Sequence, residues 1–249
     1  MIHNNFHNEE IKKNLEFWEK KPILKKIYTE FYNLISANLI DSKDGLTVEL
    51  GSGIGNIKSV IPNAICTDMF PNPWIDQVEN AYQLSFSDNS VSNIILFDVF
   101  HHIEYSGDLF LELQRVLKPN GRCIIFEPAV SLLGCFVYGV FHHEPLSLFS
   151  KIKNFRNKNI EISQLPYYSA QGNSSRIFFG KKYKILYEKK FNVIYFKKLS
   201  ALTYAASGGY SKKQLYPNNW YPFLKKIEFF TDYFPILFAT RNLIVLEKK

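Results

Sequence analysis

The residues with the clearest chemical content are three glycines at alternate positions behind an acidic side chain. Gly51, Gly53 and Gly55 follow Glu49, and the apolar run 46–50 leads directly into them. Such a run ending in glycines predicts a strand that enters a tight turn. Glycines there allow positive φ angles and let a ligand lie against bare backbone. The segment therefore predicts a cofactor site at the end of a strand.

Two phosphate-binding motifs contain similar glycines, and neither fits this chain. The dinucleotide fingerprint has a third glycine three residues after its second, where this chain has Asn56. A P-loop ends in Gly-Lys followed by Ser or Thr, and no such tripeptide occurs here. The glycines therefore belong to another kind of cofactor site.

Acidic residues and histidines recur where later strands are expected to end. Asp68 closes one short apolar run, and Asp98 follows the run 93–97. His101 and His102 come directly after Asp98. Because histidine titrates near neutral pH, it is the first candidate for a general base.

Five ordered motifs between residues 47 and 129 resemble class I S-adenosylmethionine (SAM)-dependent methyltransferases. The resemblance is to type 11-like members, including uncharacterised bacterial ones. The motifs are ExGxGxG at 49–55, CTDM at 66–69, NAYQLSFSDNS at 80–90, ILFDVFHHI at 95–103 and RVLKPNGR at 115–122.

The resemblance implies SAM as methyl donor and S-adenosyl-L-homocysteine (SAH) as product. In this family the acid that ends the second strand binds the ribose hydroxyls, and the next apolar side chain packs on adenine. The cofactor-binding residues implied are Glu49, Gly51, Ser52, Gly53, Asp68, Met69, Asn80, Ala81 and Asp98. Asn80 departs from the family's usual acid, although its amide oxygen can still accept a hydrogen bond from adenine.

The methyl acceptor is predicted to be a small-molecule or glycan hydroxyl, with His101, His102 or His143 as its base. The segment 142–144, His-His-Glu, could also be a helix-start turn with no chemical role. A metal could be held by the two histidine pairs and Asp98, but adjacent histidines tend to point apart on regular elements, so we expect no metal site. The motif Asn-Pro-Pro-Tyr of amino-group methylation is absent.

These groups must be positioned by an α/β fold of the Rossmann-like methyltransferase type. We expect a mostly parallel seven-stranded sheet, with an N-terminal helical cap at 1–45, a SAM-binding core at 46–129, and a substrate lobe with the last strands at 130–249. The lobe should be aromatic and basic. The strands expected are 46–50, 64–69, 82–86, 93–97, 122–126, 191–198 and 243–247.

Helices and turns are expected between these strands. Apolar spacing predicts helices over 8–20, 23–40, 109–117 and 222–229, and Lys-Pro-Asn-Gly at 118–121 predicts a turn. Between Asp68 and Asn80 the chain has two prolines and little length. We therefore expect the second crossover to be a shortened loop through Trp74 rather than a helix.

Charge divides the chain into two unlike parts. Residues 1–150 carry 11 Lys/Arg against 18 Asp/Glu, a net of −7, and residues 151–249 carry 19 against 5, a net of +14. The basic part favours an anionic acceptor, although its lysines could simply solvate an aromatic lobe. Three alternatives stay open: an RNA methyltransferase, a lipid-directed enzyme whose run 130–141 touches a membrane, and a non-catalytic SAM-binding protein.

Other sequence features set the expected location. No run approaches the roughly 18 apolar residues of a membrane span, and the N-terminus does not resemble a signal peptide. The three cysteines, Cys66, Cys123 and Cys135, have no CxxC spacing and are expected to be reduced thiols. We therefore expect a cytoplasmic protein.

Overall fold

The computed structural model describes residues 2–41, 45–141, 144, 146–157, 159–162, 165 and 167–249 of the 249-residue chain. The strands are β1 Leu46–Leu50, β2 Ile65–Asp68, β3 Gln77–Val78, β4 Val91–Phe97, β5 Leu117–Pro128, β6 Phe191–Leu199 and β7 Arg241–Lys248. The helices are α1 Ile2–Lys20, α2 Pro22–Ser36, α3 Ser106–Val116, α4 Leu132–Phe136, α5 Asn173–Phe179, α6 Leu202–Ser207, α7 Tyr221–Thr231 and α8 Pro235–Phe238.

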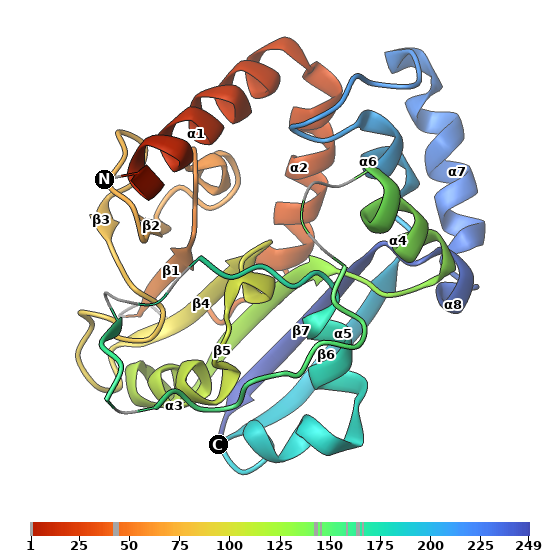
Figure 1. Cartoon of the computed structure of the whole chain (residues 1–249). Helices are drawn as coiled ribbons and strands as arrows, with labels where there is room; N and C mark the ends of the chain where they lie inside the picture. Colours follow the sequence, from red (N-terminus) through yellow and green to blue (C-terminus); the bar gives the residue numbers. More distant parts are fainter. Residues whose placement is uncertain are drawn as a thin grey trace.

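The strands form a seven-stranded sheet in the order β3-β2-β1-β4-β5-β7-β6 (Figure 1). Strands β1 to β5 run parallel, and β7 runs antiparallel to both of its neighbours. The expected Rossmann-like, mostly parallel sheet is confirmed. In such a sheet the carboxyl ends of β1, β2, β4 and β5 meet at one edge, where ligands bind in open α/β sheets.

Strand β4 shows how the sheet is covered on both faces. Ile94 and Leu96 belong to one hydrophobic cluster, and Ile95 and Phe97 belong to the other. The first cluster includes the buried side of α3, and the second includes α2. Because successive side chains of a strand point to opposite faces, this part of β4 is apolar on both faces. Buried Asn93, earlier in the strand, is satisfied by hydrogen bonds with Ile40 and Thr47.

The predicted strand at 82–86 is wrong, because the third strand lies earlier, at β3. Arg115 donates hydrogen bonds to the carbonyl oxygens of Leu84 (2.8 Å) and Phe86 (2.9 Å), and Glu112 accepts one from the Leu84 amide at 2.7 Å. Side chains of α3 therefore satisfy the backbone groups that a sheet ladder would have used.

The shortened second crossover is confirmed. No helix lies between β2 and β3 in the described residues 69–76, and Asp76 anchors the loop by accepting a hydrogen bond from the Cys66 amide at 2.8 Å. Where a turn was predicted at 118–121, the structure has a bulge within strand β5: Val91 pairs with Leu117 and Asn93 with Arg122, and Asn120 has a φ of 61°.

The C-terminal half adds the last strands and a group of short helices. Buried Lys21, between α1 and α2, donates hydrogen bonds to the carbonyl oxygens of Ser207 (3.0 Å), Gly209 (2.7 Å) and Lys212 (2.5 Å). This lysine therefore fixes the loop 207–212 against the N-terminal helices. Among the described residues, no helix is both long and apolar enough to cross a bilayer.

Candidate active site

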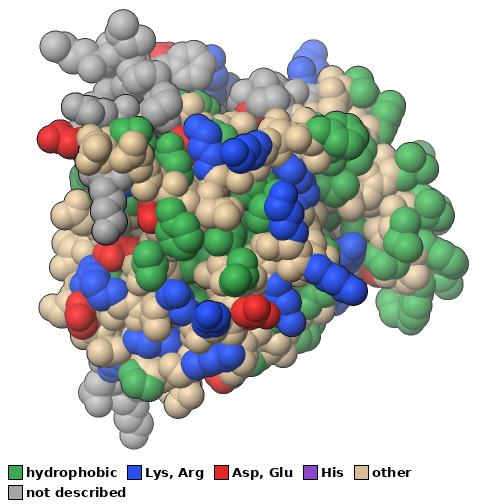
Figure 2. Space-filling model, turned by 60° about the horizontal axis from the view of Figure 1, so that its bottom comes forward, with side chains coloured by type: hydrophobic (Ala, Val, Ile, Leu, Met, Phe, Trp, Pro, Cys, Tyr) green, Lys and Arg blue, Asp and Glu red, His purple; other side chains and the backbone are tan. Residues whose placement is uncertain are grey.

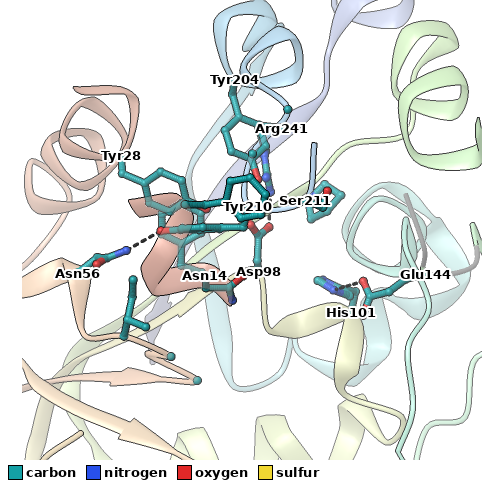
Figure 3. A pocket seen from close by; sticks show the side chains of 18 of the residues that line it. Asn14, Tyr28, Asn56, Asp98, His101, Glu144, Tyr204, Tyr210, Ser211 and Arg241 are labelled. Atoms are coloured by element: carbon teal, nitrogen blue, oxygen red, sulfur yellow. Dashed lines mark hydrogen bonds and ion pairs between the residues drawn. The ribbon is translucent and has the colours of Figure 1, made fainter. Parts of the chain in front are cut away.

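A cavity of about 560 Å³ lies at the carboxyl edge of the sheet, where β1 and β4 end. Its walls come from the glycine turn after β1, from α1 and α2, from the segment after β4, and from the loop 208–212 (Figure 3). Both halves of the chain therefore contribute to one site.

The three glycines of the turn have different roles. All have positive φ, at 69° for Gly51, 55° for Gly53 and 66° for Gly55. A Cβ on Gly51 would lie 2.4 Å from the side chain of Val99, and one on Gly55 would lie 2.8 Å from the Trp74 carbonyl oxygen. A Cβ on Gly53 would have no heavy atom within 4 Å. Gly51 and Gly55 are thus needed for packing, whereas Gly53 leaves open space beside the cavity.

Glu49 places an acid in the cavity wall. Its side chain is buried, and its Oε2 atom has no hydrogen-bond partner. Burial raises the pKa of Glu49 from its ordinary 4.5 to about 7. An unpartnered buried carboxylate oxygen next to open space fits a cationic ligand group, such as the amino group or sulfonium of SAM. The site thus suits SAM on the chemistry of its own residues.

Of the other expected cofactor residues, Asp68 contacts the glycine turn. Asp68 accepts a hydrogen bond from the Gly53 amide at 3.2 Å, so the acid at the end of β2 holds the turn. Met69 is half exposed, and the Asn80 Oδ1 atom accepts from the Tyr82 amide at 3.0 Å. The cavity lining includes Gly51, Ser52, Gly53 and Asp98 but none of Asp68, Met69, Asn80 and Ala81.

Asp98 is paired with a basic residue that the sequence analysis did not single out. The residue has a φ of 56°, and its carboxylate forms a short ion pair with Arg241 at the start of β7. The Arg241 guanidinium is buried and lies 4.4 Å from the ring centroid of Tyr204. The sequence feature that could have pointed to Arg241 is its position, as a charged residue shortly before the apolar run 243–247.

Tyrosines from distant segments line one wall of the cavity, which we call the roof. Tyr28 of α2 lies 5.3 Å from Tyr210 and 6.0 Å from Tyr204 between ring centroids. The Asn56 amide nitrogen donates to the Tyr210 hydroxyl at 2.6 Å, which connects the glycine turn to the loop 208–212 (Figure 3). Tyr28 and Asn56 were missed by the sequence analysis because their role depends on segments far apart in the chain.

Two of the three candidate catalytic histidines meet at the other end of the cavity. His101 Nδ1 lies 2.8 Å from Glu127 Oε2, and its Nε2 lies 3.2 Å from Glu144 Oε2. His102 Nδ1 lies 3.0 Å from the Tyr168 carbonyl oxygen, and its Nε2 lies 3.4 Å from Glu144 Oε1. Both imidazoles therefore face the same carboxylate.

The electrostatic surroundings of the two imidazoles differ. Burial alone would lower the pKa of His101, but the charges and hydrogen bonds of Glu127 and Glu144 raise it to about 10. Burial and the neighbouring His101 lower the pKa of His102 to about 4. The expectation that adjacent histidines point apart is wrong here, because the two ring centroids are 4.1 Å apart. The third candidate, His143, lies outside the described residues, as does His142.

Glu144 is itself held by neighbouring donors. The Tyr167 hydroxyl donates to its Oε1 atom at 2.9 Å, and the Gln171 amide nitrogen donates to Oε2 at 2.5 Å. Glu127 accepts from the Phe100 amide at 2.6 Å. The two imidazoles and two carboxylates are thus rigidly placed. Glu127 and Gln171 were not recognised in the sequence.

Comparison with known proteins identifies one family model and several similar proteins. Residues 49–125 match the model described as a methyltransferase domain. The ubiquinone/menaquinone biosynthesis C-methyltransferase UbiE of Desulfotalea psychrophila is 27% identical over 124 residues, which are 41% of this chain. The match spans only 50% of that relative.

Solved structures with a similar fold include two methyltransferases. Geranyl diphosphate C-methyltransferase from Streptomyces coelicolor aligns over 89% of this chain and 79% of its own, with a TM-score of 0.54 and 10% identity. A SAM-dependent methyltransferase from Thermotoga maritima, described as a possible histamine N-methyltransferase, aligns over 97% and 99% with a TM-score of 0.54 and 15% identity. At these identities the similarity concerns the fold.

Proposed function

The chain carries a class I SAM-dependent methyltransferase domain, and we propose that it methylates a hydroxyl group of a small-molecule or glycan acceptor bound in the cavity. One observation carries the proposal. The same cavity has the glycine turn with Glu49 at one end and the His101–His102–Glu144 cluster at the other. A methyl donor and an acceptor could therefore be aligned within it.

The residues near the glycine turn would hold the donor. Glu49 supplies an unpartnered carboxylate oxygen, and Gly53 leaves room for a ligand against the backbone. Bound SAM supplies an electrophilic methyl group on a sulfonium. The chain's own contribution is alignment, since in-line displacement depends mainly on the position of the nucleophile.

His102 is the candidate base that the geometry favours. Its Nδ1 faces the Tyr168 carbonyl, which can only accept, so Nδ1 carries the proton and Nε2 carries the lone pair. His101 has both ring nitrogens against carboxylates and is enclosed. The acceptor oxygen would form its bond to the methyl carbon while its proton passes to His102 and the carbon–sulfur electron pair remains on sulfur.

The cavity also has features that suit an anionic acceptor. Lys13 and Lys212 lie in its wall, whereas Arg241 is already paired with Asp98. The two lysines belong to α1 and to the loop 208–212. A carboxylate or phosphate on the acceptor would have a basic partner there.

Calorimetry with SAM and SAH on the purified protein tests the donor side. We expect micromolar binding of both, and binding of neither would contradict the proposal. An acceptor screen that follows SAH release then compares wild type with His102→Ala. The variant should keep SAM affinity and lose about 100-fold or more in kcat, in the range of general base catalysis.

Mass spectrometry of the product separates the remaining alternatives. Two of the similar proteins are named C-methyltransferases, so carbon is the alternative acceptor atom. A product methylated on carbon would contradict the hydroxyl assignment. Turnover on RNA with steep salt dependence would favour an RNA substrate. Cofactor binding without turnover on any acceptor class would favour a non-catalytic SAM-binding protein.

A second candidate is an acceptor presented at an anionic membrane surface, and an exposed aromatic surface favours it. We call it the aromatic surface: Phe136 of α4, Phe223, Phe229 and Phe230 of α7, Tyr233, Phe234, and Ile236 and Leu237 of α8, which are each 45–79% exposed. Figure 2 shows hydrophobic side chains gathered at the edge of the molecule where α7 and α8 lie in Figure 1. Patches of this kind mark interaction sites.

Two features favour a lipid bilayer as the partner of the aromatic surface: the positive charge of this part of the chain and the connection of the surface to the cavity. The part of the chain that contains α7 and α8 carries the net charge of +14 counted over 151–249, which would attract anionic lipids. Phe136 and Val140 are exposed, and between them Val137 and Tyr138 line the cavity. An amphiphilic acceptor could thus pass from the interface to the site.

Vesicle flotation tests the second candidate. We expect binding to phosphatidylglycerol-containing vesicles, a loss of about tenfold or more in Phe136→Asp and Phe230→Asp, and little binding to neutral phosphatidylcholine. Phe149→Asp, at an exposed phenylalanine outside these helices, serves as the matched control. Equal binding of all variants would contradict this candidate, and concentration-dependent self-association without lipid would point to a dimer interface instead.

A further inference from the structure

The cluster at the acceptor end of the cavity has the composition of a metal centre. From the described residues, His101, His102 and Glu144 bring one potential ligand atom each to within 4.8 Å of one another. Two imidazole nitrogens with a carboxylate oxygen suit Zn²⁺ and related divalent ions. The three side chains come from the segment after β4 and from the segment after η3 (Val137–Phe141), so only the fold brings them together.

Two of the separations are close to the spacing of ligands around one ion. Glu144 oxygens lie 3.2 Å from His101 Nε2 and 3.4 Å from His102 Nε2. Two atoms that each lie about 2.1 Å from a tetrahedral Zn²⁺ are about 3.4 Å apart. The His101–Glu127 hydrogen bond is shorter, at 2.8 Å, and the His101 Nε2–Glu144 contact is a longer hydrogen bond that a bound ion could replace.

The tautomers of both imidazoles are set by partners on their far sides. Glu127 accepts from His101 Nδ1, and the Tyr168 carbonyl accepts from His102 Nδ1. Metal-binding histidines characteristically donate their other ring N–H to a carboxylate or a backbone carbonyl in this way. The His102 Nε2 lone pair then faces Glu144 Oε1 at 3.4 Å, so two electron-rich atoms lie opposite each other. At His101 Nε2, 3.2 Å from Glu144 Oε2, a bound ion would take the place of the ring proton.

The buried carboxylates around the cluster also favour a bound cation. Glu127 and Glu144 are both buried beside this cluster. A divalent ion would balance two buried carboxylates, which otherwise carry a large desolvation cost. The donors from Tyr167 and Gln171 would remain as outer contacts that orient the Glu144 carboxylate.

We infer that His101, His102 and Glu144 form a binding site for a divalent transition-metal ion of the Zn²⁺ class, with its open side toward the cavity. The inference deepens the proposed function and rests on it for the role of the acceptor oxygen. A hydroxyl at the open position would have its pKa lowered and would lose its proton to solvent. His102 would then act as a ligand rather than as the base.

Metal binding is measurable without any substrate. The full-length protein is stripped with a chelator, dialysed against Zn²⁺ or Co²⁺, and analysed by elemental analysis and by the visible absorption of Co²⁺. We expect about one ion per chain, with Co²⁺ absorption typical of tetrahedral nitrogen and oxygen ligands. His102→Ala and Glu144→Gln should each weaken binding by more than about 100-fold. Glu127→Gln should weaken it by about 10–100-fold through the outer contact.

Controls separate this inference from the proposed function. Glu104→Gln removes a nearby carboxylate that pairs with Lys153, and it should leave metal affinity unchanged. SAM affinity, measured on every variant, reports both folding and the donor site. Normal SAM binding with no ion bound, or equal ion binding in wild type and His102→Ala, would overturn the metal site alone. Absent SAM binding would instead contradict the proposed function.

Discussion

The two ends of the cavity are built in different ways. At the proposed donor end, the turn after β1 presents backbone beside the Glu49 carboxylate, and its glycines fix the shape. At the acceptor end, side chains from segments as distant as His101, Glu144 and Gln171 converge in one hydrogen-bonded network. A site built from the backbone of one turn can be encoded by a short local sequence. A site built from side chains of distant segments depends on the whole fold.

The two halves of the chain also differ in what they contribute to the cavity. The acidic part, 1–150, supplies the sheet edge and the glycine turn, and the basic part supplies Tyr204 and Tyr210 of the roof and most of the aromatic surface. The Asp98–Arg241 pair, the Asn56–Tyr210 hydrogen bond and the contacts of Lys21 connect the two. Each connection can be broken to ask how much one half depends on the other.

The largest expected effect is at the Asp98–Arg241 pair. Asp98→Asn keeps a residue type that tolerates the positive φ but leaves the buried Arg241 charge without its partner. The free energy of unfolding should fall by about 3–5 kcal/mol, as measured by urea titration. The double variant Asp98→Asn/Arg241→Met should recover most of that loss. No difference between the single and double variants would show that the pair does not hold the halves together.

A smaller and more specific effect is expected at the glycine turn. Gly51→Ala brings a Cβ against Val99 at a positive φ, so it should lower stability by about 2–4 kcal/mol. Gly53→Ala shares the backbone strain of about 1–2 kcal/mol but meets no atom of the protein. It should instead weaken SAM binding by about tenfold or more in calorimetry. Unchanged SAM affinity in Gly53→Ala would place the cofactor elsewhere.

The smallest effect is a pH dependence at Glu49. Since burial raises the pKa of Glu49 from 4.5 to about 7, the folded state binds more protons than the unfolded state between these values. The contribution of Glu49 to the free energy of unfolding therefore falls as the pH rises from about 4.5 through 7. Binding of the cationic donor should strengthen over the same range, as the Glu49 carboxyl loses its proton.

Glu49→Gln provides the control for that pH dependence. The variant has no titrating carboxyl, so its unfolding and its SAM affinity should lack the component between pH 5 and 7. Calorimetry at several pH values, with wild type and variant in parallel, isolates the difference. Parallel curves for the two proteins would show that Glu49 does not titrate against the ligand.

Much of the fold was predictable because its signals are local. The apolar runs at β1, β2, β4, β6 and β7, the loop in place of a second crossover helix, and the irregular backbone at 118–121 all follow from spacing, proline and glycine. The exception was residues 82–86, where the pattern looked like a strand. Arg115, which lies in one of the sequence motifs, donates hydrogen bonds to the backbone carbonyl oxygens of that segment.

The sequence by itself determined most of the sheet, the glycine turn, the acids Glu49, Asp68 and Asp98, and with them the class of cofactor. Those features lie within short segments whose backbone conformation their own residues dictate. Only the tertiary structure decided that Arg241 pairs with Asp98, that Tyr28 and Tyr210 share a roof, and that His101 and His102 face Glu144. These contacts join residues tens to more than a hundred positions apart. No local pattern encodes them, because their energy comes from burying charges and rings together only after the chain has folded.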